Sequence, residues 1–172
     1  MKRILSITSL FLLIAAGAHG VWTPLVPGAS DGDSPIIMDM SVSDAGTVFD
    51  VSIPGIDITE LDSGQGVFQE LAIPSAGWLR DTGAPQVPVI RKNIIVPMDG
   101  TVSLDITVNR TTSLDNVNAL PAQPSTKRTE EKPPFQIDAR IYQSDSLYPS
   151  TWGRIVEDSI LRDFRFVTIE LN

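Results

Sequence analysis

The chain contains no cysteine, and its only histidine, His19, lies within the first twenty residues. If that segment is removed, the remaining chain cannot form a Cys–His or Ser–His–Asp nucleophilic centre. It also lacks the thiolates and imidazoles that bind zinc, and it cannot form disulfides. We therefore expect a mature chain without catalytic residues, metal or cofactor, in which only carboxylate chemistry stays open to an enzyme.

Sustained helical periodicity is a second absence. The chain has 13 prolines and 12 glycines, which interrupt it too often for long helices. The only helical turns that the pattern allows lie within residues 150–161, where apolar side chains could share one face.

Basic residues are the third shortage, with 13 Lys and Arg against 21 Asp and Glu and a formal net charge of −8. A chain this acidic is repelled by phosphate backbones and by anionic lipid. We expect no nucleic-acid partner and no membrane contact after processing.

The N-terminal segment differs from the rest. Lys2 and Arg3 precede an apolar run that ends near Ala16, and Ala18-His19-Gly20 follows. A charged start, a short apolar run and small residues at the end predict a secretory signal peptide of residues 1–20, cleaved after Gly20. The chain is therefore expected to be exported to the extracellular space or cell surface of a bacterium.

Short apolar runs separated by turn residues fill the remainder. Residues 21–35 are rich in Pro, Gly, Ser and Asp, so we expect an irregular leader there and a single domain over 36–172. The clearest strand is 101–108, in which apolar and polar residues alternate strictly. The other expected strands are 36–42, 47–53, 66–73, 89–96, 135–143 and 164–171. Together they predict an all-β fold, an antiparallel β-sandwich of about seven to nine short strands.

Pro85 and Pro88 stand just ahead of the apolar run from Val89 to Val96. Proline fixes φ and removes a backbone donor, so this stretch can only be extended or at a sheet edge. The two prolines are expected to set the angle at which an edge strand begins.

Residues 121–135 form the most polar connection. They contain four prolines, three basic residues and two glutamates, and no aliphatic side chain larger than alanine. Such a segment cannot contribute to a core, which makes it an exposed loop. It carries the dibasic pair Lys127-Arg128, whose shape suits the acidic specificity pocket of a protease that cleaves after basic residues. A solvated linker is the alternative interpretation.

Three other features are weaker. Asp31 and Asp33 could bind calcium, but no glutamate follows at a suitable offset. The triplet at 109–111 fits the N-glycosylation pattern, which is frequent by chance. The tryptophans at 22, 78 and 152 are too scattered to predict a sugar-binding platform.

From Phe49 onward, the chain resembles the N-terminal prodomain of gingipain-type (family C25) cysteine peptidases. The resemblance is carried by Gly83-x-Pro85-x-x-Pro88, by Tyr148-Pro149 and by Leu161-Arg162-Asp163 followed by Arg165, in that order. It implies a β-sandwich that assists folding of a catalytic domain and blocks its cleft until proteolysis removes it.

The resemblance also implies a role for the polar loop. Such prodomains present a basic side chain to the specificity pocket, and Arg128 lines up best with that position, with Lys127 beside it. The implied partner is the cognate peptidase domain. Because the family's prodomain continues with further strands before its catalytic domain, the domain at 36–172 is expected to be truncated at its C-terminal end.

Two other functions stay open on the residues alone. A bacterial surface module that binds glycans or host proteins would need only the β-sandwich. An enzyme using carboxylates alone is the least favoured, because no carboxylate pair stands out among the acids.

Overall fold

The computed structural model describes residues 20–43, 46–127, 129, 131 and 133–172. The predicted signal peptide lies outside these residues apart from Gly20 and stays a prediction. Nine strands occur in the described part, and every ladder between them is antiparallel. The predicted all-β class with seven to nine short strands is confirmed. No helix among the described residues has the length and apolar character needed to cross a membrane.

The strands form three sheets. Strand β4 (Gly55–Asp62) lies between β1 (Val21–Pro24) and β5 (Val67–Ala72), and β2 (Ile36–Ser43) pairs with β3 (Gly46–Ser52) as a hairpin. The largest sheet has the order β6-β7-β9-β8. Its strands are β6 (Gly77–Trp78), β7 (Pro88–Val96), β8 (Gly153–Leu161) and β9 (Phe164–Leu171).

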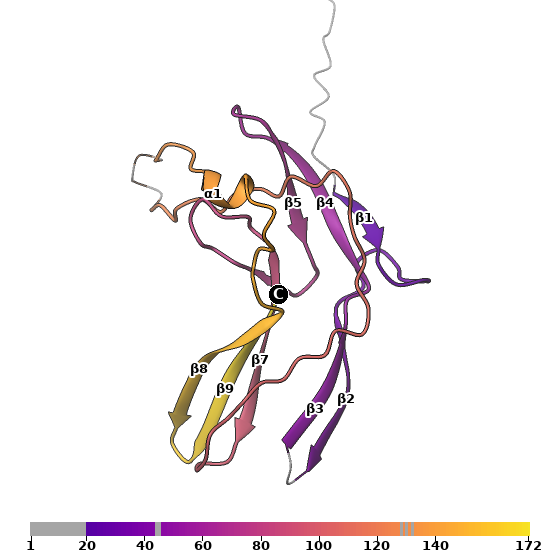
Figure 1. Cartoon of the computed structure of the whole chain (residues 1–172), viewed down its shortest axis with the longest axis vertical. Coiled ribbons are helices and arrows are strands. Elements are labelled where there is room, and N and C mark those ends of the chain that lie inside the picture. Colours follow the sequence, from indigo (N-terminus) through magenta and orange to yellow (C-terminus); the bar gives the residue numbers. More distant parts are fainter. Residues whose placement is uncertain (1–19, 44–45, 128, 130, 132) are drawn as a thin grey trace, which may run out of the picture.

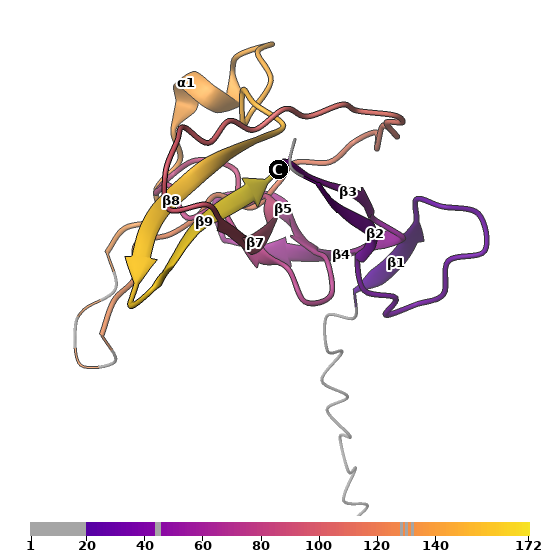
Figure 2. The same ribbon diagram turned by 90° about the horizontal axis from the view of Figure 1, so that it is seen from below.

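The β2–β3 hairpin and the β7–β9–β8 strands extend as two arms toward one end of the molecule (Figure 1). The β1–β4–β5 sheet and a short helix, α1 (Ala139–Tyr142), lie toward the other end. Seen from below in Figure 2, the long connection between β7 and α1 arcs from one arm to the other.

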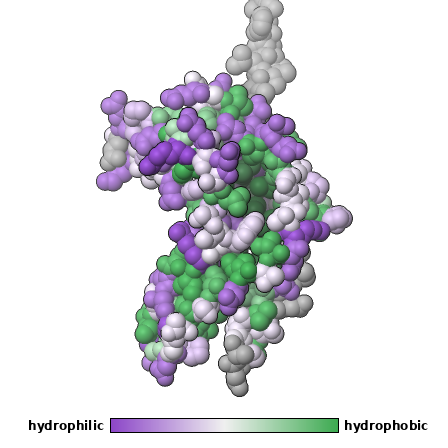
Figure 3. Space-filling view, viewed as in Figure 1, coloured by the Kyte–Doolittle hydropathy of each residue, from purple (hydrophilic) through white to green (hydrophobic). Residues whose placement is uncertain are grey.

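The core lies where these parts meet. Its buried side chains come from β4, β5, β7 and β9 and from the loops between them: Ile56, Phe68, Leu71, Leu79, Ala84, Val89, Ala122, Val167 and Ile169. Far from the core, apolar side chains are exposed along the arms, and green surface marks part of them in Figure 3.

Strand β9 also carries a buried charge. Glu170 is 1% exposed and accepts hydrogen bonds from Arg91 Nε at 2.9 Å and Arg154 Nε at 3.0 Å. The two arginines stand directly opposite Glu170 on the two neighbouring strands. Since a buried carboxylate is costly unless paired, these arginines compensate the charge on the central strand.

Three local predictions are wrong. Residues 135–143 form a loop and α1 instead of a strand, because Asp138 caps a helical turn by accepting a hydrogen bond from Arg140 N at 3.0 Å. Residues 150–161 contain β8 and no helix. Residues 101–108 make no ladder, although they alternate perfectly.

The leader also differs from expectation, because β1 lies within residues 21–35 and pairs with β4. The division into signal peptide, leader and domain stays a prediction. Pro88 occupies the first position of β7, where a missing donor is tolerated. Pro85 lies outside the strand and forms an isolated bridge with Pro121.

Candidate functional site

The loop that the sequence singles out joins the core to α1 and projects beside the helix at upper left in Figure 1. Lys127 is exposed on this loop. Arg128 lies outside the described residues, as do 130 and 132. The structure therefore places the loop and its first basic residue at the surface, and the role of Arg128 stays a prediction.

A pair of glutamines closes the base of the loop. The side-chain amide of Gln123 donates from Nε2 to the Gln136 carbonyl oxygen at 2.9 Å. Its Oε1 accepts from the Gln136 backbone N–H, also at 2.9 Å. Because one side chain satisfies both backbone groups of Gln136, the two ends of the loop are held together like neighbouring strands.

Gly83 lies just behind this base and contacts both ends. Its N–H donates to the Ala122 carbonyl at 2.8 Å, and its own carbonyl accepts from Asp138 N at 2.8 Å. Gly83 has φ +82°, and a Cβ at this position would lie 3.0 Å from Asp138 N. Only glycine satisfies this conformation and this close approach without strain.

The incoming side of the loop is fixed to two parts of the core. Ala122 N donates to the Ala84 carbonyl and Gln86 N to the Leu120 carbonyl, each at 2.8 Å. Leu120 N also donates to the Gln69 carbonyl on β5 at 2.8 Å. The loop therefore starts from a rigid, buried segment.

Aromatic packing fixes the outgoing side. The ring of Phe135 lies 5.7 Å from that of Phe68, which is itself 5% exposed and lies 6.5 Å from Tyr142 in an edge-on arrangement. Tyr142 Oη donates to the Ala119 carbonyl at 2.7 Å. Both ends of the loop are thus anchored, while the described residues between 124 and 134 make no contribution to the buried core.

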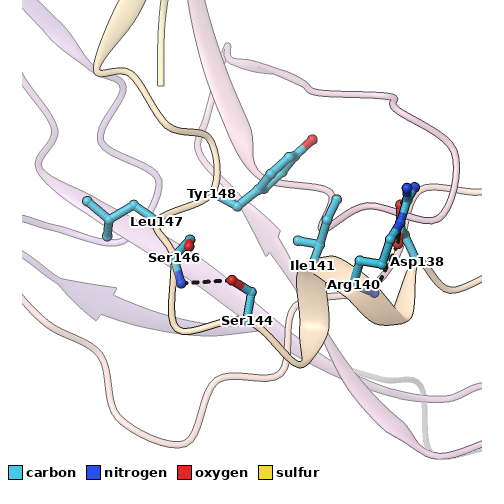
Figure 4. A pocket seen from close by; sticks show the side chains of 7 residues that line it. All are labelled: Asp138, Arg140, Ile141, Ser144, Ser146, Leu147 and Tyr148. Atoms are coloured by element: carbon cyan, nitrogen blue, oxygen red, sulfur yellow. Dashed lines mark hydrogen bonds and ion pairs between the residues drawn. The ribbon is translucent and has the colours of Figure 1, made fainter.

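An open depression lies beside the loop base, along α1 (Figure 4). Its volume is about 360 Å³. Asp138 and Arg140 form an ion pair at 2.8 Å on one side, and Ser144 and Tyr148 stand on the other. The hydrogen bond from Arg140 lowers the pKa of Asp138 below its usual value, so the carboxylate is charged at neutral pH. Among the described residues no histidine occurs, so none of them places an imidazole beside Ser144.

The two tyrosines of this region are held in their neutral form. Burial, with a contribution from Tyr148, raises the pKa of Tyr142 to about 12. Burial, with a contribution from Asp81, raises the pKa of Tyr148 to about 12, and Tyr148 Oη donates to Asp81 Oδ2 at 3.1 Å. These hydroxyls support the loop base and are not poised for acid–base chemistry near neutral pH.

The weaker candidates are dispersed. Asp33 Oδ2 accepts from Ser30 N at 2.7 Å, which is a local turn contact. In the part of the chain that the structure describes, no group of three or more His, Cys, Asp or Glu is arranged to bind a metal. Trp78 donates to the Leu71 carbonyl at 2.7 Å, whereas Trp152 is 52% exposed elsewhere.

Sequence reasoning found the loop but missed the residues that close it. Gln123 and Gln136 carry no signal by themselves, because their pairing depends on a chain reversal between them. Gly83 was part of the Gly-x-Pro pattern. The residues beside it in the sequence do not predict that it bonds to two distant backbone segments, at Ala122 and Asp138.

Comparison with known proteins gives a consistent result. The family model Propeptide_C25 matches residues 38–172. Lys-gingipain of Porphyromonas gingivalis strain ATCC 33277 is 26% identical over 172 residues, which cover 95% of this chain and 10% of that protein. Lys-gingipain W83 of the same species gives the same values. The chain thus spans about a tenth of the length of the curated relatives it matches.

Two solved structures share the fold. One, from work on the zymogenic latency of gingipain K of P. gingivalis, superposes with a TM-score of 0.67 at 23% identity, covering 91% of this chain and 86% of the other. The second, a complex of the P. gingivalis RgpB pro- and mature domains, gives a TM-score of 0.61 at 18% identity, covering 67% and 60%.

Proposed function

The chain belongs to the C25 propeptide family, and on that premise we propose that it is the secreted inhibitory propeptide of a gingipain-like cysteine endopeptidase. In this proposal the domain occludes the cleft of its cognate peptidase and assists the folding of that peptidase. The domain itself is a propeptide and contributes no catalytic group.

The observation that supports this proposal is the loop with its closed base. Gln123 and Gln136 join its ends, and Gly83 and Phe135 fix them to the core. A short loop anchored on both sides loses little conformational entropy on binding. In this proposal Arg128 enters the protease cleft, with Lys127 beside it, and the loop loses little conformational entropy on binding.

A partner follows from the relatives. RgpB has been solved as a complex of its pro- and mature domains. By analogy we propose that this propeptide binds the mature domain of its own peptidase, with export through the signal peptide of residues 1–20. No observation favours the alternative of a surface adhesion module.

The test is inhibition by the purified chain 21–172 of a gingipain-type peptidase. Wild-type protein is expected to inhibit, and Arg128→Ala to weaken inhibition by about 100-fold, because a guanidinium in an acidic pocket contributes roughly 2–5 kcal/mol. Lys127→Ala should have a smaller effect.

A matched control removes a different positive charge. Arg162 is exposed at the β8–β9 turn with φ +57°, and Arg162→Asn removes its charge while asparagine tolerates that backbone conformation. Inhibition should be unchanged in this variant. Equal inhibition by wild type and Arg128→Ala would defeat the residue assignment, and absence of inhibition by the wild type would defeat the function.

A further inference from the structure

Most of the backbone of residues 101–117 has no partner. Apart from the turn at Asp115 and Asn116, no backbone N–H or C=O of this stretch forms a hydrogen bond with another described residue. The stretch belongs to no helix or strand, and it crosses between the two arms in Figures 1 and 2. A connection this long in a compact domain usually pairs at least part of its backbone.

Both ends of the stretch are nevertheless fixed. At its start, Arg165 Nη1 donates to the carbonyl oxygens of Pro97 at 3.3 Å, Met98 at 3.5 Å and Gly100 at 2.9 Å. At its end, Asn118 N donates to Gln69 Oε1 at 2.7 Å. The stretch is therefore a chain held between two anchors and not a free tail.

Its first half has the pattern of a half-buried strand. Val102 and Leu104 are partly buried, whereas the polar residues between and around them are exposed. Ile106 packs over Gly153 at the start of β8, where an added Cβ would lie 2.8 Å from Ile106 Cδ1. Ile106 thus lies against the large sheet, although Ile106 and Val108 are still 38% and 40% exposed, and the backbone edges are left without a ladder.

We propose that residues 101–108 form an interaction surface that accepts one extended segment of the cognate peptidase as an added β-strand. The inference rests on the proposed function. The required partner is a strand, because unpaired N–H and C=O groups at strand spacing are satisfied by another extended backbone. Binding needs little ordering, since both ends of the stretch are already fixed.

The charge of the stretch specifies the partner further. Residues 101–117 carry two aspartates and one arginine, and Asp105 is the charged residue within 101–108. That arginine, Arg110, is turned toward the leader, where its Nη2 donates to the Leu25 carbonyl at 3.4 Å. Opposite charges on facing strands stabilise pairing, so the incoming segment should be basic on its polar face.

Proline substitutions test this surface. Thr107 and Val108 are adjacent, so their N–H groups point to opposite edges of an extended chain, and proline removes one donor in each variant. One of Thr107→Pro and Val108→Pro should weaken the complex between residues 21–172 and the peptidase by about tenfold, and the other should weaken it much less.

The melting temperature of isolated Thr107→Pro should equal that of the wild type. In the isolated wild-type chain the Thr107 N–H makes no hydrogen bond that the proline could remove. Thr112→Pro, in the same unpaired stretch but beyond the alternating residues, is the matched control and should bind normally. Destabilisation of isolated Thr107→Pro would mean that the stretch already pairs within the chain, which overturns the proposal.

Hydrogen exchange gives an independent readout. Amides of residues 101–108 should exchange rapidly in the isolated chain, and alternate amides should be protected in the complex. An eight-residue peptide of alternating Lys and Val should protect the same amides without any peptidase, and a Glu–Val peptide should not.

The outcomes separate the two proposals. A complex that inhibits, with 101–108 unprotected and both proline variants binding normally, overturns the added strand and leaves the inhibitory function standing. If the chain does not inhibit, the Lys–Val peptide still decides, and lack of protection at millimolar peptide overturns the added strand as well.

Discussion

At the scale of single residues, Gly83 holds the candidate loop to the domain. Its N–H and C=O bind Ala122 and Asp138, which lie on the two sides of the loop. Its φ of +82° and the 3.0 Å from an added Cβ to Asp138 N exclude a side chain for two separate reasons. The integrity of the loop base therefore depends on a residue that lies about forty positions earlier in the sequence.

Gly83→Ala is expected to destabilise the chain by about 2 kcal/mol or more, since left-handed backbone alone costs an alanine roughly 1–2 kcal/mol. Exchange at the amides of residue 83 and Asp138 should accelerate, because these two N–H groups form the bonds at the loop base, and trypsin should cleave the loop at Lys127 faster. Gly64→Ala is the matched control, because Gly64 has φ +75° with no atom within 4 Å of an added Cβ. Equal effects of the two substitutions would show that the close approach contributes nothing.

At the scale of elements, Arg165 connects the β8–β9 hairpin to the end of β7. Its Nε and Nη2 donate to the two carboxylate oxygens of Asp158 at 2.9 and 2.7 Å, and its Nη1 donates to three carbonyl oxygens of the following turn. In the sequence, Asp163 is the acidic residue nearest to Arg165, two positions before it. The sheet register instead places Asp158 opposite Val167, next to Arg165 on the same face.

Acid should release this connection. The hydrogen bond from Arg165 lowers the pKa of Asp158 below its ordinary 3.8, so the folded state favours the charged carboxylate. The contribution is complete above pH 3.8 and is lost as the pH falls through the lower pKa of the folded state. The Nε–H of Arg165, which donates to Asp158, should therefore lose its protection from hydrogen exchange only below about pH 4.

Asp158→Asn should reproduce the acid effect at neutral pH, with a lower protection factor at Arg165 Nε–H. Asp163→Asn should leave this protection factor unchanged, because the carboxylate that accepts from Arg165 belongs to Asp158. A protection factor that stays the same between pH 3 and 7 would argue against the role of this ion pair.

At the scale of the whole molecule, two tyrosines report on how the parts are assembled. The chain has only Tyr142 and Tyr148, and their hydroxyls bind Ala119 and Asp81, which lie in separate segments. Both side chains lose water when these segments pack together. Their ionisation is therefore coupled to the tertiary structure.

The folded chain is expected to show almost no tyrosinate absorbance at pH 10, because burial raises both pKa values from 10.0 to about 12. In denaturant, each tyrosine should be half ionised near pH 10. Since the neutral form is favoured in the folded state, this stability is complete below pH 10 and is lost as the pH rises toward 12. Spectrophotometric titration at 295 nm checks this, and identical curves for folded and unfolded chains would contradict it.

The sequence by itself determined the fold class, the absence of cysteine and the family. Short apolar runs, some of them alternating with period two, predicted strands, and strands formed at 36–43, 46–52, 67–72, 88–96 and 164–171. Composition determined the absence of cysteine and of any histidine after His19. These properties depend on residues and near neighbours alone.

Only the tertiary structure decided which extended segments pair. Residues 101–108 alternate more regularly than any paired strand, yet no second backbone reaches them in the described part of the chain. Residues 139–142 turn into a helix because Asp138 caps them and Tyr142 reaches Ala119. Gly83 became the base of a loop through two hydrogen bonds to segments far away in sequence. Side-chain patterns act locally, whereas backbone hydrogen bonds need a partner whose position the whole fold determines.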